Sequence, residues 1–279
     1  MTTFRLSPER RDELAALLGD EHRLRDAYPA IADYLDSAPR LAGTGDDAAD
    51  SAFDLRLLHY LTGGAADNPY WEIVGPAVAS GPAIRGHRRE ANGGNHRGSA
   101  RLGFAQTVLQ SAYSYAIPAP ETLDWITACC NGRRVVELGA GRGYWAAQLA
   151  RRGVDVLAFD AAPPGIRSNL SFPRTSGVPL SWHPVGDLAD FSRADITDAV
   201  LLLCWPPGWS DPMSSEALNA YREAGGDRLI YIGEPRGGRT ANDTFFATLE
   251  VEWVLADQDP DFVAWWNLAD VAQYWRTRG

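Results

Sequence analysis

This 279-residue chain contains no lysine and few cysteines. It contains three cysteines, Cys129, Cys130 and Cys204, and all 26 of its basic residues are arginine. Cysteines so few and so placed exclude a disulfide framework and a zinc site of ordinary spacing, so we expect a reducing compartment and no bound metal. The lack of lysine also excludes a catalytic lysine.

Long apolar runs and an excess of positive charge are lacking as well. No run approaches the roughly 18 apolar residues that a membrane span needs, and the residues after Met1 lack the apolar core of a signal peptide. We therefore expect a cytoplasmic protein with no membrane partner. The net charge of −10 argues against non-specific binding to nucleic acid, which favours basic proteins.

The most informative stretch is 133–145, which reads RRVVELGAGRGYW. It predicts a buried strand from Val135 to Leu138, a turn rich in glycine and then a helix that Gly153 ends. A second strand, 154–159, follows and leads into Asp160. This order of strand, glycine turn, helix, strand and acid is typical of the nucleoside-binding half of a doubly wound sheet.

The spacing within the turn distinguishes between cofactors. Dinucleotide-binding folds carry G-x-G-x-x-G, whereas this chain has G-x-G-x-G, with Tyr144 in the place of the third glycine. Glu137 precedes the first glycine by two residues, where an acid would repel a pyrophosphate but could hold the loop and a cationic amino group. The pattern resembles motif I of the class I S-adenosylmethionine (SAM) methyltransferases. A glycine turn that binds no cofactor is the alternative.

The resemblance covers about residues 115–276 and implies SAM as the cofactor and methyl transfer as the activity. It implies an α/β fold with a seven-stranded doubly wound sheet. We expect residues 115–279 to form this SAM-binding domain, and residues 1–114 to form a helical N-terminal extension or lid outside the common core. The resemblance places cofactor-binding residues at Tyr115, Glu137, Gly139, Ala140, Gly141, Gly143, Asp160, Ala161, Asp187, Leu188, Cys204 and Trp205.

The remaining elements follow from apolar periodicity and turn residues. Further strands are expected at 180–185, 199–204, 228–232, 251–256 and 270–275, the last two as an antiparallel hairpin at the edge of the sheet. The N-terminal part predicts helices that begin at Pro8, at about Glu21 and at about Ser51, the second of them continuing to Leu35. The period of 262–268 is ambiguous between helix and strand. Asp187 is also suited to cap a helix, a role that it can combine with the one at the adenine amino group that the resemblance implies.

The run Cys204-Trp205-Pro206-Pro207 corresponds in the resemblance to motif IV, beside the transferred methyl group. Enzymes that methylate amino groups of nucleobases carry Asp, Asn or Ser before the two prolines, and Trp205 replaces that residue here. This departure argues against base-amine chemistry. We predict instead that Trp205 and Trp209 form an aromatic wall for a flat or cationic substrate. Core packing is the alternative, since the chain has ten tryptophans.

A hydroxyl acceptor would need a general base, whereas an amine with a free lone pair would not. Glu234 is the first candidate, because it follows the predicted fifth strand at the cofactor edge of the sheet. His183 is the second, with core packing as its alternative, and Asp211 is the third.

Residues 81–103 are rich in arginine and glycine. The segment carries one acid, Glu90, and five arginines, Arg85, Arg88, Arg89, Arg97 and Arg101. A guanidinium binds carboxylate or phosphate through two parallel hydrogen bonds. We therefore predict that Arg85, Arg88 and Arg89 bind an acidic acceptor from a mobile lid, with a solvated loop as the alternative.

Together these features predict a SAM-dependent methyltransferase that acts on a small molecule, with specialised metabolism as one setting and an anionic compound among its candidate acceptors. Two other classes stay open: a SAM-binding regulatory or structural protein without catalysis, and a nucleic-acid methyltransferase that uses the arginine-rich segment. The net charge makes the nucleic-acid class the weaker of the two. Association of identical copies also stays open.

Overall fold

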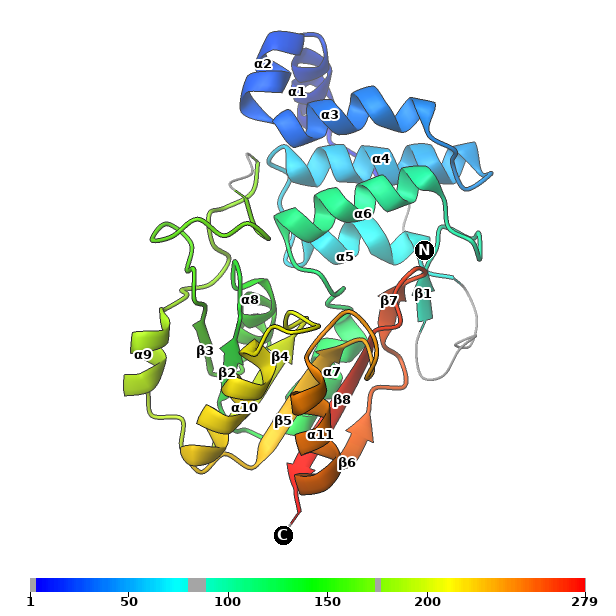
Figure 1. The fold of residues 1–279 in the computed structure, drawn as a ribbon. Helices are drawn as coiled ribbons and strands as arrows, with labels where there is room; N and C mark the ends of the chain where they lie inside the picture. Colours follow the sequence, from blue (N-terminus) through cyan, green and yellow to red (C-terminus); the bar gives the residue numbers. More distant parts are fainter. Residues whose placement is uncertain (1–3, 80–88, 174–176, 279) are drawn as a thin grey trace.

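The computed structural model describes residues 4–79, 89–173 and 177–278, and it places a layer of helices over one edge of a mixed α/β unit (Figure 1). The helical layer contains α1 (Pro8–Leu18), α2 (Glu21–Ala27), α3 (Pro29–Ser37), α4 (Asp47–Leu61), α5 (Pro69–Val74) and α6 (Ala100–Ala112), with short 3-10 turns η1 (Ala38–Arg40) and η2 (Gly75–Ala77). None of the helices in these described ranges is long and apolar enough to cross a membrane.

Local sequence explains where the first helices begin and end. The Ser7 hydroxyl accepts a hydrogen bond from the Arg10 amide and Pro8 occupies the first turn, as predicted. The single helix expected from Glu21 to Leu35 is wrong, because the structure divides it into α2 and α3 between Tyr28 and Pro29. Proline lacks the amide hydrogen that would continue α2, and it restricts the preceding residue to non-helical backbone angles.

The α/β unit is built on a six-stranded sheet within the described part of the chain. Its order is β3-β2-β4-β5-β8-β6, in which β8 runs antiparallel to both of its neighbours and the other pairs are parallel. The strands are β2 (Val135–Leu138), β3 (Val156–Phe159), β4 (Val200–Cys204), β5 (Arg228–Gly233), β6 (Trp253–Gln258) and β8 (Val271–Thr277). The antiparallel pairing of the last two predicted strands is confirmed.

Helices cover both faces of this sheet. Apolar residues of α7 (Pro120–Cys130) and α8 (Tyr144–Arg151) pack on one face, and those of α10 (Met213–Glu223) and α11 (Asp243–Glu252) pack on the other. Successive strand residues alternate between the two cores, as Val135 and Val136 do. The short α9 (Leu188–Arg193) lies beyond β3 (Figure 1).

Within the described residues the main sheet has six strands rather than the seven expected. Residues 180–185 form no strand, and the only ladder contact next to them is an isolated parallel bridge between Phe159 and Gly186. Pro179 and Pro184 cannot donate to a ladder, and the Trp182 amide donates instead to Arg142 of the glycine turn, at 2.8 Å. A separate pair that the sequence did not predict joins β1 (Arg89–Ala91) to β7 (Val263–Trp265) in parallel.

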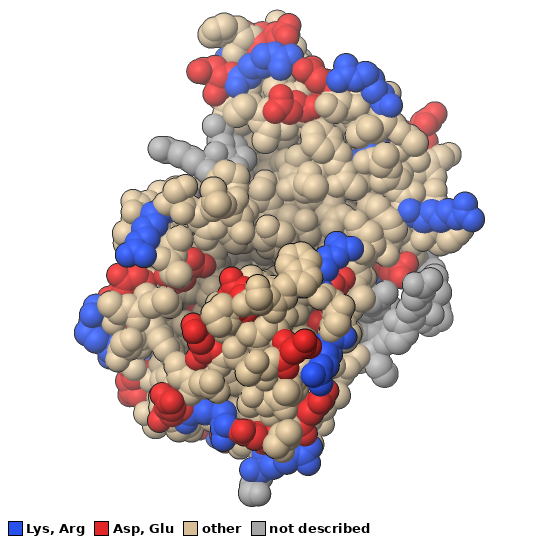
Figure 2. Space-filling model, viewed as in Figure 1, with Lys and Arg blue, Asp and Glu red and all other residues tan. Residues whose placement is uncertain are grey.

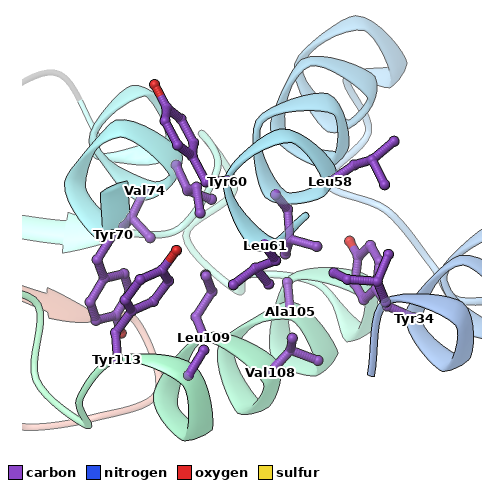
Figure 3. Close-up of a cluster of buried hydrophobic side chains, with 14 of the residues drawn as sticks. Tyr34, Leu58, Tyr60, Leu61, Tyr70, Val74, Ala105, Val108, Leu109 and Tyr113 are labelled. Atoms are coloured by element: carbon purple, nitrogen blue, oxygen red, sulfur yellow. The ribbon is translucent and has the colours of Figure 1, made fainter. Parts of the chain in front are cut away.

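The helices of this layer pack around an apolar core (Figure 3), and Tyr144, Val263 and Trp265 of the α/β unit belong to the same core. Tyr70 of α5 and Tyr113 at the end of α6 stack with ring centroids 5.3 Å apart. Tyr144 of α8 packs beside both of them, and its hydroxyl donates to Asn68 Oδ1 at 2.9 Å and accepts the Tyr70 amide at 3.1 Å. The indole of Trp265 in β7 donates to the Tyr70 hydroxyl. These buried contacts fix the helical layer against the carboxyl ends of the parallel strands.

Candidate functional site

A pocket of about 1340 Å³ opens between the helical layer and the carboxyl ends of β2, β3 and β4. Figure 2 shows it as a hollow in the middle of the face, with few charges inside and acidic side chains along its lower edge. Open parallel sheets bind ligands at this edge. The volume exceeds the roughly 300–1,000 Å³ of a pocket for one small molecule, so two reactants can be held together.

The glycine turn forms the floor of the pocket. Gly139 and Ala140 line it, and the backbone of Gly139 has a positive φ of 75°. Gly141 lies behind them, where a Cβ atom would come within 2.4 Å of the Phe172 ring. Glycine is therefore required at 141 for the close approach of the 169–172 segment, which forms another part of the pocket wall.

Most amide groups of the turn are already bonded within the protein. The Gly139 and Ala140 amides donate to Phe159 O at 2.9 and 3.1 Å, and the Gly143 amide donates to Ala140 O at 2.7 Å. The Gly141 amide donates to the Asp160 carboxylate at 2.8 Å. A turn that cradles a phosphate needs free amides. These four bonds therefore favour a ligand without phosphate groups.

Two buried carboxyl groups, Glu137 and Asp160, stand beside this turn. Glu137 is 2% exposed and accepts the Ala146 amide at 3.1 Å. Burial, with a smaller contribution from the Asp160 charge, raises the pKa of Glu137 to about 8. Asp160 accepts the Gly141 and Ala162 amides, one on each oxygen, both at 2.8 Å. Oδ1 also accepts Asn169 Nδ2 at 3.4 Å, whereas Oδ2 can accept a second hydrogen bond, so Asp160 can still bind a hydroxyl group of a ligand.

Aromatic rings form the inner side of the pocket. Tyr115 stacks on Trp205 with centroids 5.0 Å apart and planes 10° from parallel, and Phe172 meets Tyr115 edge-on at 5.8 Å. The Trp205 indole donates to Asp270 Oδ2 at 2.9 Å, which fixes the ring. Trp209 lines the rim and is 79% exposed. Both tryptophans of the predicted aromatic wall thus line the pocket, Trp205 within it and Trp209 at its mouth.

The structure brings most of the expected cofactor residues into this pocket. Its lining includes Tyr115, Glu137, Gly139, Ala140, Asp160, Ala161, Leu188, Cys204 and Trp205. Gly141, Gly143 and Asp187 lie outside the described lining. Gly143 is the residue before α8, and Asp187 caps α9 by accepting the Asp190 amide at 2.8 Å, so the helix cap expected at Asp187 is confirmed. Burial raises the pKa of the Cys204 thiol well above its usual range, so this sulfur is no nucleophile at neutral pH.

Neither of the two leading base candidates is among the described residues that line the pocket. Glu234 is 5% exposed, and its carboxylate accepts the Arg239 amide at 2.6 Å and the Ala269 amide at 3.0 Å. It therefore fastens the loop after β5 to the segment before β8. A ring nitrogen of His183 lies 3.3 Å from Val156 O, beside β3. The structure gives both side chains a position outside the pocket; Asp211 does line it.

The arginine-rich segment contributes little to the described pocket. Arg85 and Arg88 lie outside the described residues, and Arg89 is ion-paired with Glu121 at 3.1 Å rather than lining the pocket. Arg101 is paired with Asp54. The described lining contains Asp160, Asp211, Glu216 and Arg239, together with Glu137, whose raised pKa keeps it largely protonated at neutral pH. Acids therefore outnumber bases there, which argues against the predicted anionic acceptor.

Sequence reasoning missed two groups of residues around the pocket. Gln106, Gln110 and Ser114 line it from α6 and the turn that follows. Their i, i+4, i+8 spacing, which places them on one side of a helix, was a readable signal. Arg142 within the glycine turn is 2% exposed, and its guanidinium donates to the carbonyls of Pro173 and, at 3.2 Å, Pro179. This buried arginine holds Pro173 and Pro179 beside the pocket, a role that no local pattern indicates.

Comparisons with known proteins find partial similarity to proteins named as methyltransferases. No family model matches the chain. A stretch of 64 residues, 22% of the chain, is 41% identical to the uncharacterized methyltransferases Rv3342 of Mycobacterium tuberculosis and Mb3374 of Mycobacterium bovis. A stretch of 146 residues, 51% of the chain, is 35% identical to a protein-L-isoaspartate O-methyltransferase of Methylorubrum extorquens.

These matches cover only part of this chain and only part of each relative. The chain spans 25% of the length of the mycobacterial relatives and 58% of the length of the Methylorubrum protein. Among solved structures, the crystal structure of EvdMO1 aligns with 59% of this chain and 42% of its own, at 16% identity and a TM-score of 0.32.

Proposed function

We propose that this protein is a SAM-dependent methyltransferase that acts on a small molecule. The observation that carries the proposal is the glycine turn at the carboxyl end of β2. Most of its amides are bonded internally, and Asp160 and the Tyr115–Trp205 pair line the same pocket. Such a site suits a nucleoside cofactor that lacks phosphates. The partial similarity to proteins named as methyltransferases supports the same conclusion.

The residues present fit SAM. Asp160 retains a lone pair for a ribose hydroxyl, and Leu188 and Ala161 line the pocket next to it with apolar surface suited to an adenine ring. Glu137 stands in the pocket wall where a cationic amino group would favour its ionised form. When bound, SAM would supply a methyl group on a positively charged sulfur, so the activated methyl group and the leaving group both come from the cofactor.

The contribution of the chain is therefore to align the acceptor and to exclude water. Trp205 and Tyr115 provide a rigid flat surface at the end of β4, and the helical layer covers the pocket from above. Glu234 and His183 are engaged elsewhere, so an acceptor that needs a general base would depend on Asp211, which lines the pocket. A nucleophile with an available lone pair needs no such base.

Calorimetry on the full chain with SAM, S-adenosylhomocysteine and NAD tests the cofactor. We expect both sulfur compounds to bind and NAD to bind far more weakly. Asp160→Ala should weaken S-adenosylhomocysteine binding by about 1–3 kcal/mol, the scale of a lost hydrogen bond to a charged group. Asp155→Ala, at the opposite end of the same strand, is the matched control and should leave affinity unchanged. Preferential binding of NAD, or equal affinity in Asp160→Ala, would refute the assignment.

A SAM-binding protein without catalysis is a second candidate, favoured by the position of Glu234 and His183 outside the described pocket lining. Release of S-adenosylhomocysteine from SAM in the presence of an acceptor separates the two. Binding of SAM with no turnover on any member of a broad panel of amines, phenols and alcohols would support the binding protein.

A further inference from the structure

We propose that the pocket-facing residues Gln106, Gln110 and Ser114, here called the α6 strip, recognise the acceptor as a neutral, hydroxyl-bearing ring compound. The proposal rests on the proposed function and names the substrate class of that site. It assigns acceptor recognition to the helical layer and cofactor binding to the strand ends.

The α6 strip is an exception on its helix. Most of the neighbouring positions, among them Leu102, Ala105 and Leu109, are buried in the apolar core that joins the two layers. Gln106 is only 5% exposed although it is polar, and it lines the pocket. A buried amide is retained only where its hydrogen-bonding groups are satisfied. Partners from the protein satisfy only part of the strip.

The hydrogen bonds within the protein orient the groups that remain. Gln106 Oε1 accepts a hydrogen bond from Asn267 Nδ2 at 2.9 Å. Gln106 Nε2 therefore points away from Asn267 and is left as a donor. Gln110 Nε2 donates to Tyr115 O at 3.1 Å, which leaves its oxygen as an acceptor. Ser114 Oγ donates to Ala116 O at 2.8 Å and keeps its lone pairs. In the described part of the chain these remaining groups have no protein partner.

The strip thus offers a donor at Gln106 and an acceptor at Gln110, about 6 Å apart along the helix axis. A hydroxyl group both donates and accepts, so two hydroxyls of one ligand can satisfy the pair. A carboxylate or phosphate only accepts, and it would leave Gln110 Oε1 without a donor beside a pocket whose described charges are mostly acidic. Neutral hydroxylated ligands are therefore favoured over anions.

The aromatic pair lies next to the strip. Tyr115 follows Ser114 directly and stacks on Trp205, so a ligand that reaches the strip also reaches a flat ring surface. Ring stacking holds a planar body in offset contact. A hydroxylated aromatic ring combines both features.

The test uses 3,4-dihydroxybenzyl alcohol as a neutral probe and 3,4-dihydroxybenzoate as its anionic counterpart, titrated into the full chain saturated with S-adenosylhomocysteine. We expect the alcohol to bind at least about 5-fold more tightly than the benzoate. Gln106→Leu and Gln110→Leu should each weaken binding of the alcohol by about 3- to 10-fold, the range for one hydrogen bond. Affinity for S-adenosylhomocysteine should stay within about 2-fold in both variants.

Thr107→Val, on the exposed side of α6, is the matched control and should behave as the parent. Because Gln110 is less buried than Gln106, its variant keeps the test valid if Gln106→Leu does not fold. Failure of the parent to bind S-adenosylhomocysteine would refute the proposed function. If that compound binds normally, three results would overturn the inference while leaving the proposed function intact. They are unchanged probe affinity in both variants, equal or tighter binding of the benzoate, and no saturable binding of either probe.

Discussion

The two walls of the pocket are built in different ways. The sheet wall consists of strand ends and turns, with Glu137, Gly139 and Asp160 held by backbone hydrogen bonds within residues 137–160. The helix wall is one face of α6, brought into place by a core that joins residues far apart in the chain. The sheet wall carries buried carboxyl groups, whereas the α6 strip is neutral. The comparison indicates that cofactor binding should depend on pH and that recognition by the strip should not.

The largest effect is expected at Glu137 in the sheet wall. Its folded pKa of about 8 lies above the ordinary 4.5, so between these values the native protein holds a proton that the unfolded chain has released. Stability therefore falls as pH rises through this window, by up to about 1.4 kcal/mol per pH unit. Glutamine removes this loss while keeping an acceptor for the Ala146 amide. We expect Glu137→Gln to gain up to about 4 kcal/mol relative to the parent between pH 5 and pH 8.

Urea unfolding at pH 5, 6, 7 and 8 measures this gain as a difference in the free energy of unfolding. Glu223→Gln, at the exposed end of α10, is the control and should follow the parent at every pH. A constant offset between Glu137→Gln and the parent would show that Glu137 does not titrate in this window.

An intermediate effect on stability is expected at Tyr144, which joins the two walls. Tyr144→Phe removes the hydroxyl that accepts the Tyr70 amide and donates to Asn68. A buried amide left without a partner costs about 1–3 kcal/mol. We expect a lower midpoint in thermal unfolding and still a single transition, because both layers share one core.

Tyr28→Phe is the control for Tyr144→Phe, since the Tyr28 hydroxyl has no hydrogen-bond partner among the described residues. Two separate transitions in Tyr144→Phe, reported by different probes of unfolding, would show that the walls are energetically independent.

The smallest effect is expected at Trp209 on the rim. Trp209→Ala removes a side chain that is 79% exposed, so the free energy of unfolding should change by no more than about 0.5 kcal/mol. Trp205→Ala is the contrasting variant, because it removes a stacked ring and the hydrogen bond to Asp270. Equal stability losses in the two variants, measured by urea unfolding, would mean that Trp209 is packed in solution.

Short-range patterns predicted the sheet wall well. The glycine turn, its two flanking strands and the apolar β4 all lie within a few residues of the predicted bounds. The third predicted strand failed because prolines on either side interrupt a ladder and Trp182 bonds to the turn instead. The pairing of β1 with β7 joins residues 89 and 263, a distance in sequence that no local period can indicate.

For the site residues, too, local patterns predicted some positions correctly and failed where contacts between distant residues decide. Asp160 follows its strand directly and so necessarily lies at the carboxyl edge of the sheet. Glu234 also follows a strand at that edge, yet its carboxylate is taken up by the amides of Arg239 and Ala269. The sequence showed on which edge of the sheet the Glu234 backbone lies. The direction of its side chain depends on contacts with loops elsewhere in the chain, which local sequence does not indicate.

The sequence by itself determined the strand–turn–helix unit at 135–151 and the acids that flank it, because backbone angles and strand burial are set by adjacent residues. Tertiary structure alone decided which residues face the acceptor. Gln106 is oriented by Asn267, and Tyr144 is held by Asn68 and Tyr70. Contacts between residues so distant in the chain form only when a shared core brings the elements together, and their free energy depends on that whole packing arrangement.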